Sequence, residues 1–318
     1  MIVEAAILLK TMALIATLIL VIVGVAFGQL RIGKAALIAH DMQPQAQSAI
    51  ARTTIISMGI SETACILALT GIIMVLFKQP VVGVQEVFAN IAYSSIVFAL
   101  GISGLCVGFC SCLPAQTALY SVARQPFFAN KIINVMLITM SIIQTPVIFG
   151  FVITLLISLQ ASTLASVNEA YKLCAAAWCV GIGSIGPLVG QGLFAQSACF
   201  VVGLNRKNYT QILTFALLSQ TLIETPIIIA LLVSILVFSA PAVTTAKLIA
   251  LIAAAVCQSI CNFMPGIASG RTSATACRQL GGANNTASVT GVSLLAQGLL
   301  DTFAIYGLLV SILLIYGS

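Results

Sequence analysis

The stretch "LLSQTLIETPIIIALLVSILVF", residues 217–238, is apolar almost throughout but carries Glu224 near its middle. A run of this length and composition can cross a hydrocarbon core about 30 Å thick as a helix. A carboxylate at that depth costs about 2.5–3.5 kcal/mol on insertion scales, so it indicates a function rather than a packing role. Pro226, two residues later, lacks the N–H that a helix interior needs. The stretch therefore predicts a membrane helix with a polar site inside it.

The composition of the whole chain agrees with this prediction. Of its 318 residues, 60% are hydrophobic and only 6% are charged, with a mean hydropathy of +1.16. Soluble domains carry about 25% charged residues. Long apolar runs recur along the chain, and they are continuous instead of alternating, which favours helices over a barrel. We predict an all-α membrane protein with eight transmembrane helices.

The chain contains four copies of one pattern, about 80 residues apart. Each copy has a Gly-rich and Ala-rich apolar helix, a short polar loop and a second apolar helix. The polar residues inside the second helices are Glu62, Gln144, Glu224 and Asp301. We predict four tandem helical hairpins, over residues 1–80, 81–163, 164–242 and 243–318, of which the second lacks an acid.

Small residues recur one turn apart in the first helix of each hairpin. The pairs include Gly24 and Gly28, Gly104 and Gly108, Gly186 and Gly190, and Gly266 and Gly270. Such spacing lets helix backbones approach closely in lipid. It predicts a tightly packed inner layer of first helices, and ordinary packing between helix pairs is the alternative.

The polar loops carry most of the positive charge. Nine of the chain's 13 lysines and arginines lie in or beside the four loops. The positive-inside rule then places the loops in the cytoplasm and both termini on the opposite side of the membrane. The net charge of +6 follows from this topology, and nothing in it indicates binding to nucleic acid.

Three of the seven acidic residues lie at equivalent depth inside the second helices, namely Glu62, Glu224 and Asp301. No lysine or arginine lies at that depth in the sequence to neutralise them. A carboxylate facing lipid must be protonated or bound to a cation. Three such residues at repeat-equivalent positions indicate ion translocation.

Several short motifs accompany these acids. They are "RQP" at 124–126, the related Met42-Gln43-Pro44, "GKA" at 33–35, "GPLVGQG" at 186–192, and a threonine after each second-helix acid. With these motifs, each hairpin resembles the proteolipid, or c-subunit, of the rotary F-type and V-type ATPases. The resemblance covers essentially the whole chain. The sequence leaves F-type and V-type membership open.

The resemblance implies a non-catalytic rotor subunit that carries Na⁺ or H⁺ on its carboxylates, coupled to ATP synthesis or hydrolysis, without a cofactor. Copies of the chain would form a double-layered ring in membrane lipid. That ring would turn against a stator a-subunit with an essential arginine. Two alternatives remain: a stand-alone eight-helix cation transporter, which should show inverted repeats, and a structural or pore-forming proteolipid.

The resemblance also implies that central-stalk subunits bind the cytoplasmic loops. The loop residues expected to face the stalk are Gln43, Pro44, Arg124, Gln125, Pro126, Asn205, Arg206, Arg278 and Gln279.

Sodium-binding members of the family use a first-helix Gln, the second-helix acid, the hydroxyl after it and a backbone carbonyl two residues before it. By resemblance, the third hairpin offers Gln191, Glu224, Thr225 and the Leu222 carbonyl, and the first offers Gln29, Glu62 and Thr63. Na⁺ at Glu62 and Glu224 is therefore the alternative to H⁺. Pro226 donates no hydrogen bond to Leu222, four residues back, so we hypothesise that it frees this carbonyl for the ion.

The other two hairpins depart from the sodium pattern. The fourth has Asp301, Thr302 and Tyr306, where family members have a tyrosine that locks the site, but Ala268 or Ser269 in place of the first-helix Gln. It is expected to bind ions less tightly or to prefer protons. The second has Gln144, Thr145 and Ser111. Because Gln cannot titrate, this hairpin should carry no ion by itself.

Overall fold

The structure is a computed structural model, and it describes residues 2–78, 84–282 and 286–317. Over these residues it contains helices and no strand, and eight helical spans are long and apolar enough to cross a membrane. The predicted all-α membrane fold is confirmed. The predicted hairpin boundary between residues 80 and 81 lies outside the described residues, as do residues 283–285 of the fourth polar loop.

The helices follow the chain in hairpin order. The first two hairpins comprise α1 (Ile2–Met42), η1 (Pro44–Ala46), α2 (Gln47–Leu76), α3 (Val84–Ser94), the π-helical turn η2 (Val97–Ile102), α4 (Ser103–Arg124), η3 (Pro126–Phe128), α5 (Ala129–Ile143), α6 (Thr145–Gln160) and η4 (Ala161–Thr163). The last two comprise α7 (Val167–Gly183), α8 (Ile185–Val202), α9 (Tyr209–Ser239), α10 (Thr245–Leu280) and α11 (Thr286–Gly317).

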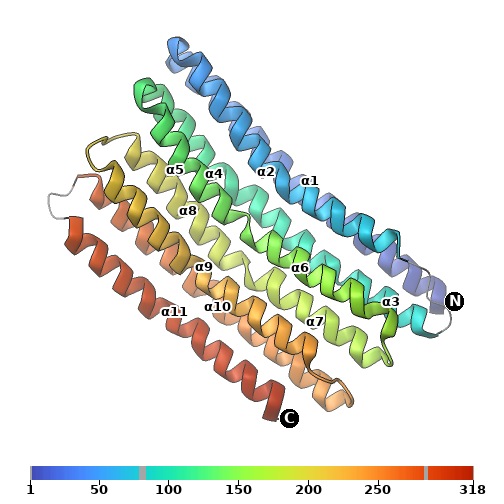
Figure 1. Cartoon of the computed structure of the whole chain (residues 1–318). Coiled ribbons are helices and arrows are strands. Elements are labelled where there is room, and N and C mark those ends of the chain that lie inside the picture. The colour runs from blue at the N-terminus through green and yellow to red at the C-terminus, as the bar shows by residue number, and fades with distance from the viewer. Residues whose placement is uncertain (1, 79–83, 283–285, 318) are drawn as a thin grey trace.

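The hairpins lie side by side in chain order, from α1 and α2 at one edge to α11 at the other (Figure 1). The first helices form one row, in which α1 packs on α4, α4 on α8 and α8 on α10. The second helices α2, α5–α6, α9 and α11 form the other row. The N and C labels lie at one end of the array, and the polar loops lie at the opposite end.

Glycines bring the backbones of the first row together. A Cβ atom on Gly28 would lie 2.4 Å from the carbonyl oxygen of Gly108, and one on Gly190 would lie 2.1 Å from that of Gly266. Both distances are far below van der Waals contact, and the obstacle is backbone, which cannot swing aside. The predicted close approach of the first helices is therefore confirmed within this chain.

The two edges of the array remain apolar and uncovered. In the first span and in the last span, only 28% of the most apolar window is buried inside the chain. In the span Val167–Val202, 72% of that window is buried. Leu37 on α1 and Leu295 on α11 are 69% and 72% exposed. These faces need lipid or another protein surface to cover them.

Two of the spans are broken near mid-membrane, each next to a proline. The second helix of hairpin 2 breaks at Gln144, before Pro146, and the first helix of hairpin 3 breaks at Ser184, before Pro187. The missing proline N–H explains why the helical hydrogen bonding is interrupted there. By contrast, α9 runs without a break through Pro226.

Candidate ion-binding sites

The Glu62 site lies on the uncovered edge of the array. The amide Nε2 of Gln29 on α1 donates a 2.9 Å hydrogen bond to Oε1 of Glu62 on α2. The Thr63 hydroxyl donates instead to the Ile60 carbonyl, at 2.8 Å. Glu62 and Thr63 are both exposed in the single chain. The structure thus joins two of the predicted ligands and leaves the outer side of this site open.

The Glu224 site spans two hairpins. Glu224 on α9 is half-buried, and the side chain of Thr145, at the start of α6 in hairpin 2, lies close enough to interact with its carboxyl group. The hydroxyl hydrogen of Thr145 is directed to the Ile142 carbonyl at 2.8 Å. The threonine oxygen is then available to a protonated Glu224 or to a cation held by its carboxylate.

Three buried glutamines lie on the helix of Glu224 or on helices packed against it, and among the described residues neither the nitrogen nor the oxygen of their amides has a hydrogen-bond partner: Gln144, Gln191 and Gln220. Gln144 precedes Thr145, and Gln220 lies one turn before Glu224 on α9. Gln191 is on α8, which packs against both α5 and α9. A buried polar group without a partner costs about 1–3 kcal/mol, so this set favours a bound ligand.

The carbonyl of Leu222 differs from the equivalent carbonyls of the other hairpins in the hydrogen bonds that it accepts. In hairpins 1, 2 and 4, the threonine after the acid position donates to the carbonyl two residues before that position, namely Ile60, Ile142 and Leu299. In hairpin 3, Thr225 turns to the Thr221 carbonyl instead, at 3.3 Å. Pro226 has no N–H to give to Leu222. The Leu222 oxygen therefore lacks both of these donors.

The Asp301 site is the most enclosed of the three. Asp301 on α11 is only 6% exposed, and its Oδ1 has no hydrogen-bond partner. The Thr302 hydroxyl is occupied by the Leu299 carbonyl at 2.7 Å. Tyr306 is 62% exposed on the uncovered side of α11, where its ring packs against Phe303. Ser269, one of the two predicted first-helix substitutes, is fully buried without a partner.

Two polar residues near the acids were missed in the sequence. Gln220 and Gln297 each lie four residues before an acid, in "QTLIET" and "QGLLDT", whereas Met58 and Met140 occupy that position in the first two hairpins. Gln297 donates to Ser219 Oγ on α9 at 3.3 Å, which joins hairpins 3 and 4. An alignment of the third hairpin with the fourth would have revealed the shared Gln.

The second hairpin places no acid at this depth. Gln144 lies at the break between α5 and α6, and its side chain is 6% exposed. Ser111 is fully buried on α4, and its hydroxyl donates to the Gly108 carbonyl at 3.3 Å. Gln144 and Thr145 therefore contribute to the surroundings of Glu224 rather than to a separate site with Ser111.

The predicted loop residues gather at one end of the array, where the loops bond to one another (Figure 1). Arg206 Nε donates to Gln125 Oε1 at 2.7 Å, linking hairpins 2 and 3. Asn205 Nδ2 donates to the Gly281 carbonyl at 2.7 Å, linking hairpins 3 and 4. The other predicted positions are Gln43 and Pro44 at η1, Arg124 at the end of α4, Pro126 at the start of η3, and Arg278 and Gln279 in the last turn of α10.

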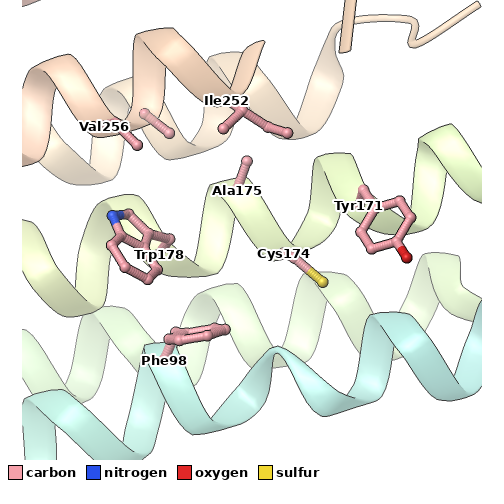
Figure 2. A pocket seen from close by; sticks show the side chains of 8 residues that line it. Phe98, Tyr171, Cys174, Ala175, Trp178, Ile252 and Val256 are labelled. Carbon is pink, nitrogen blue, oxygen red and sulfur yellow. The ribbon is translucent and has the colours of Figure 1, made fainter. Parts of the chain in front are cut away.

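An apolar cavity of about 290 Å³ lies away from these carboxylates, in the row of first helices. Figure 2 shows Trp178 and Tyr171 on α7, with Phe98 on one side and Ile252 and Val256 of α10 on the other. The Phe98 and Trp178 rings pack 5.2 Å apart. Its lining includes none of the three acids, so this cavity is no candidate for an ion site.

Eight apolar helical spans, three of which carry an acid near the middle, are typical of a class: integral multi-pass membrane proteins that carry ions. Comparison with known proteins supports this class. The family described as the C subunit of ATP synthase matches residues 252–314. The chain is also 26% identical over 216 residues to the K subunit of the A-type ATP synthase of Methanocaldococcus jannaschii, an alignment that covers 68% of this chain and 91% of that protein.

Both comparisons support a relationship to the proteolipids of the rotary ATPases, which are non-catalytic c- or K-type rotor subunits of ATP synthases. Similarity to this family favours assembly of such subunits into a ring. The finding favours the rotor over the stand-alone transporter and over a purely structural proteolipid.

Proposed function

We propose that this rotor protein binds and transports Na⁺ on Glu62 and Glu224, and that ion passage through its ring is coupled to ATP synthesis or hydrolysis. The observation that carries the sodium assignment is the surroundings of Glu224, where three buried amides on its own helix and on the helices packed against it have no partner among the described residues, and the Thr145 side chain lies close to the carboxyl group. Oxygen atoms of amides, hydroxyls, carboxylates and carbonyls are the ligands that hard cations prefer. A proton would need only one acceptor and would leave the remaining amides unsatisfied.

Ring assembly completes the Glu62 site. Within the chain, Glu224 meets Thr145 of the preceding hairpin. Glu62 has no preceding hairpin in its own chain, and its outer side is exposed. The equivalent partner is Thr302 of a neighbouring copy, on the uncovered side of the array beside Tyr306. Apolar faces at both edges provide the surface for that contact.

The proposed function also requires partner subunits and a defined orientation in the membrane. The polar loops lie in the cytoplasm and bind central-stalk subunits, and the far end faces the other side of the membrane. Phe127, which is 99% exposed among the joined loops, offers an apolar anchor for such a partner. A stator arginine opens each site, and lipid covers the ring elsewhere. Labelling with a membrane-impermeant amine reagent tests the topology: Lys207 should react from the cytoplasmic side and Lys78 from the opposite side.

Carbodiimide labelling of rings in membranes tests the function. The reagent modifies protonated carboxyl groups, and peptide mass spectrometry separates Glu62, Glu224 and Asp301. We expect Na⁺ to protect Glu62 and Glu224 at constant pH, with Glu169 at the membrane surface as an unprotected control. Equal labelling of Glu224 with and without Na⁺ would contradict the sodium assignment.

A further inference from the structure

Gln297 holds an unusual position beside Asp301. It lies one turn before Asp301 on the same face of α11, and it is fully buried. Its Nε2 lies 3.0 Å from Ser293 Oγ, 3.2 Å from the Ser293 carbonyl oxygen and 3.3 Å from Ser219 Oγ. The amide is therefore anchored to both α11 and α9.

These contacts fix the direction of the amide. The carbonyl oxygen of Ser293 can only accept a hydrogen bond, so the NH₂ group of Gln297 must face it. The Oε1 atom then points away from Ser293, and it has no partner. Oδ1 of Asp301 is also buried without a partner. Residues four apart on a helix are neighbours, so the unpaired Oε1 of Gln297 and the unpaired Oδ1 of Asp301 belong to side chains one turn apart on the same face of α11.

The two acceptors, Gln297 Oε1 and Asp301 Oδ1, can be satisfied together by a proton or a cation between them. At Asp301 the first helix offers no glutamine at the aligned position, because residue 268 is Ala, and the single hydroxyl hydrogen of Thr302 is directed to the Leu299 carbonyl rather than to the acid. Ser269 on α10 adds one buried hydroxyl. A single proton on Asp301, donated to Gln297 Oε1, satisfies both unpaired oxygens at once.

At the Glu62 site, the hydrogen bond between the amide and the acid runs in the opposite direction. There the amide nitrogen of Gln29 donates to the carboxylate, an arrangement that favours the charged form and hence a bound cation. We propose that Gln297 is a positioning residue that makes Asp301 a proton-binding site, in a chain whose Glu62 and Glu224 sites bind sodium. This inference rests on the proposed rotor function and assigns the ion of its third carboxylate.

The ionisable groups of the elements packed around Asp301 leave this arrangement intact. At comparable depth they are Glu224 on α9, Cys257, Cys261 and Arg271 on α10, and Tyr306 on α11. Glu224 interacts with Thr145, on the side of α9 away from α11. Arg271 and Tyr306 are exposed, and Cys261 packs against Gly307 beyond the acid.

The test uses the full-length ring in membranes, with carbodiimide labelling of each acid measured against pH and Na⁺. We expect Asp301 to label up to a higher pH than Glu62 and to gain no protection from Na⁺ that protects Glu224. Gln297→Met, which installs the residue found in hairpins 1 and 2, should lower the midpoint pH of Asp301 labelling by about one unit, the effect of losing one hydrogen bond. The Glu62 midpoint in the same molecules should stay unchanged.

Two outcomes would overturn the inference: protection of Asp301 by Na⁺ as strong as that of Glu224, or an unchanged Asp301 midpoint in Gln297→Met. Ser219→Ala provides a milder variant, since it removes one anchor of the amide and keeps its carbonyl. It should shift the midpoint in the same direction by a smaller amount, and no shift would also count against the inference. Absence of Na⁺ protection at Glu62 and Glu224 alone would instead refute the sodium function.

Discussion

Gln29 and Glu62 are joined across the first hairpin by a 2.9 Å hydrogen bond, in which the amide donates to the carboxylate. Gln191 and Glu224 have the same separation in sequence, yet the amide of Gln191 has no hydrogen-bond partner in the part of the chain that the structure describes. In the first pair, the amide of Gln29 is hydrogen-bonded to the acid. In the second pair, the amide of Gln191 is available to a ligand. Substitutions in and around the two sites should therefore change ion binding at one site and spare the other.

Gln29→Leu removes the donor to Glu62 without adding charge. We expect the Na⁺ concentration that half-protects Glu62 from carbodiimide to rise about tenfold, the effect of one charge-assisted hydrogen bond. Protection of Glu224 should be unchanged. Gln211→Leu, at an exposed position of α9 far from both acids, is the matched control. A similar loss at Glu224 would mean that the substitution disturbs the whole ring rather than one site.

Pro226→Ala restores an N–H that can donate to the Leu222 carbonyl. If this carbonyl binds the ion, Na⁺ should protect Glu224 several-fold less well, about fivefold for one competing hydrogen bond. The measurement is the Na⁺ concentration for half-protection of Glu224. Pro265→Ala, inside α10, controls for the general effect of removing a helical proline. Unchanged sodium affinity would contradict the hypothesis that Pro226 frees the Leu222 carbonyl for the ion.

Gln144→Glu adds a carboxylate to the hairpin that lacks one. Since Gln144 is buried beside Thr145, and Thr145 interacts with Glu224, we expect two effects. The new Glu should react with carbodiimide, and the number of ions moved per ATP in reconstituted vesicles should rise. Repulsion between the two carboxylates should also weaken the charged form of Glu224. An unlabelled residue 144 would show that this hairpin never becomes accessible to the reagent.

Gly190→Ala should destabilise the array, because the added Cβ would lie 2.1 Å from the Gly266 carbonyl oxygen. Overpacking of this kind costs about 1–3 kcal/mol. Thermal unfolding of the detergent-solubilised protein would measure it as a lower midpoint. Gly59→Ala is the control, since nothing lies within 4 Å of its added Cβ. Its helix propensity predicts equal or greater stability. Equal melting of the two variants would contradict the proposed role of close backbone approach.

Much of the fold could be predicted from the sequence because lipid imposes simple rules. Continuous apolar runs predict spanning helices, and the spaced glycines predict the backbone contacts of the first row. The repeat also predicts a common depth for Glu62, Glu224 and Asp301, and this depth stays a prediction. What it could not predict was the rotation of each helix, which decides whether a polar side chain meets its partner.

The candidate sites illustrate this limit. The spacing from Gln191 to Glu224 equals that from Gln29 to Glu62, but only the first hairpin forms the hydrogen bond. The break at Ser184 gives hairpin 3 a different path from that of hairpin 1. Gln297 was missed for another reason: a single amide in an apolar helix carries no periodic pattern. Its role depends on Ser219, which lies 78 residues away in the chain.

The order of the hairpins in Figure 1 has a consequence for the rhythm of rotation. Because the four hairpins are covalently linked, the uncharged position at Gln144 recurs at a fixed place in any ring of these chains. In the proposed ring, a stator would meet carboxylates at unequal intervals: one hairpin without an acid separates Glu62 from Glu224, and the other neighbouring acids lie in adjacent hairpins. Rotation of such a ring would combine one step of two hairpin positions with two steps of one position each. Elastic elements of the enzyme would then have to store torque during the longer step.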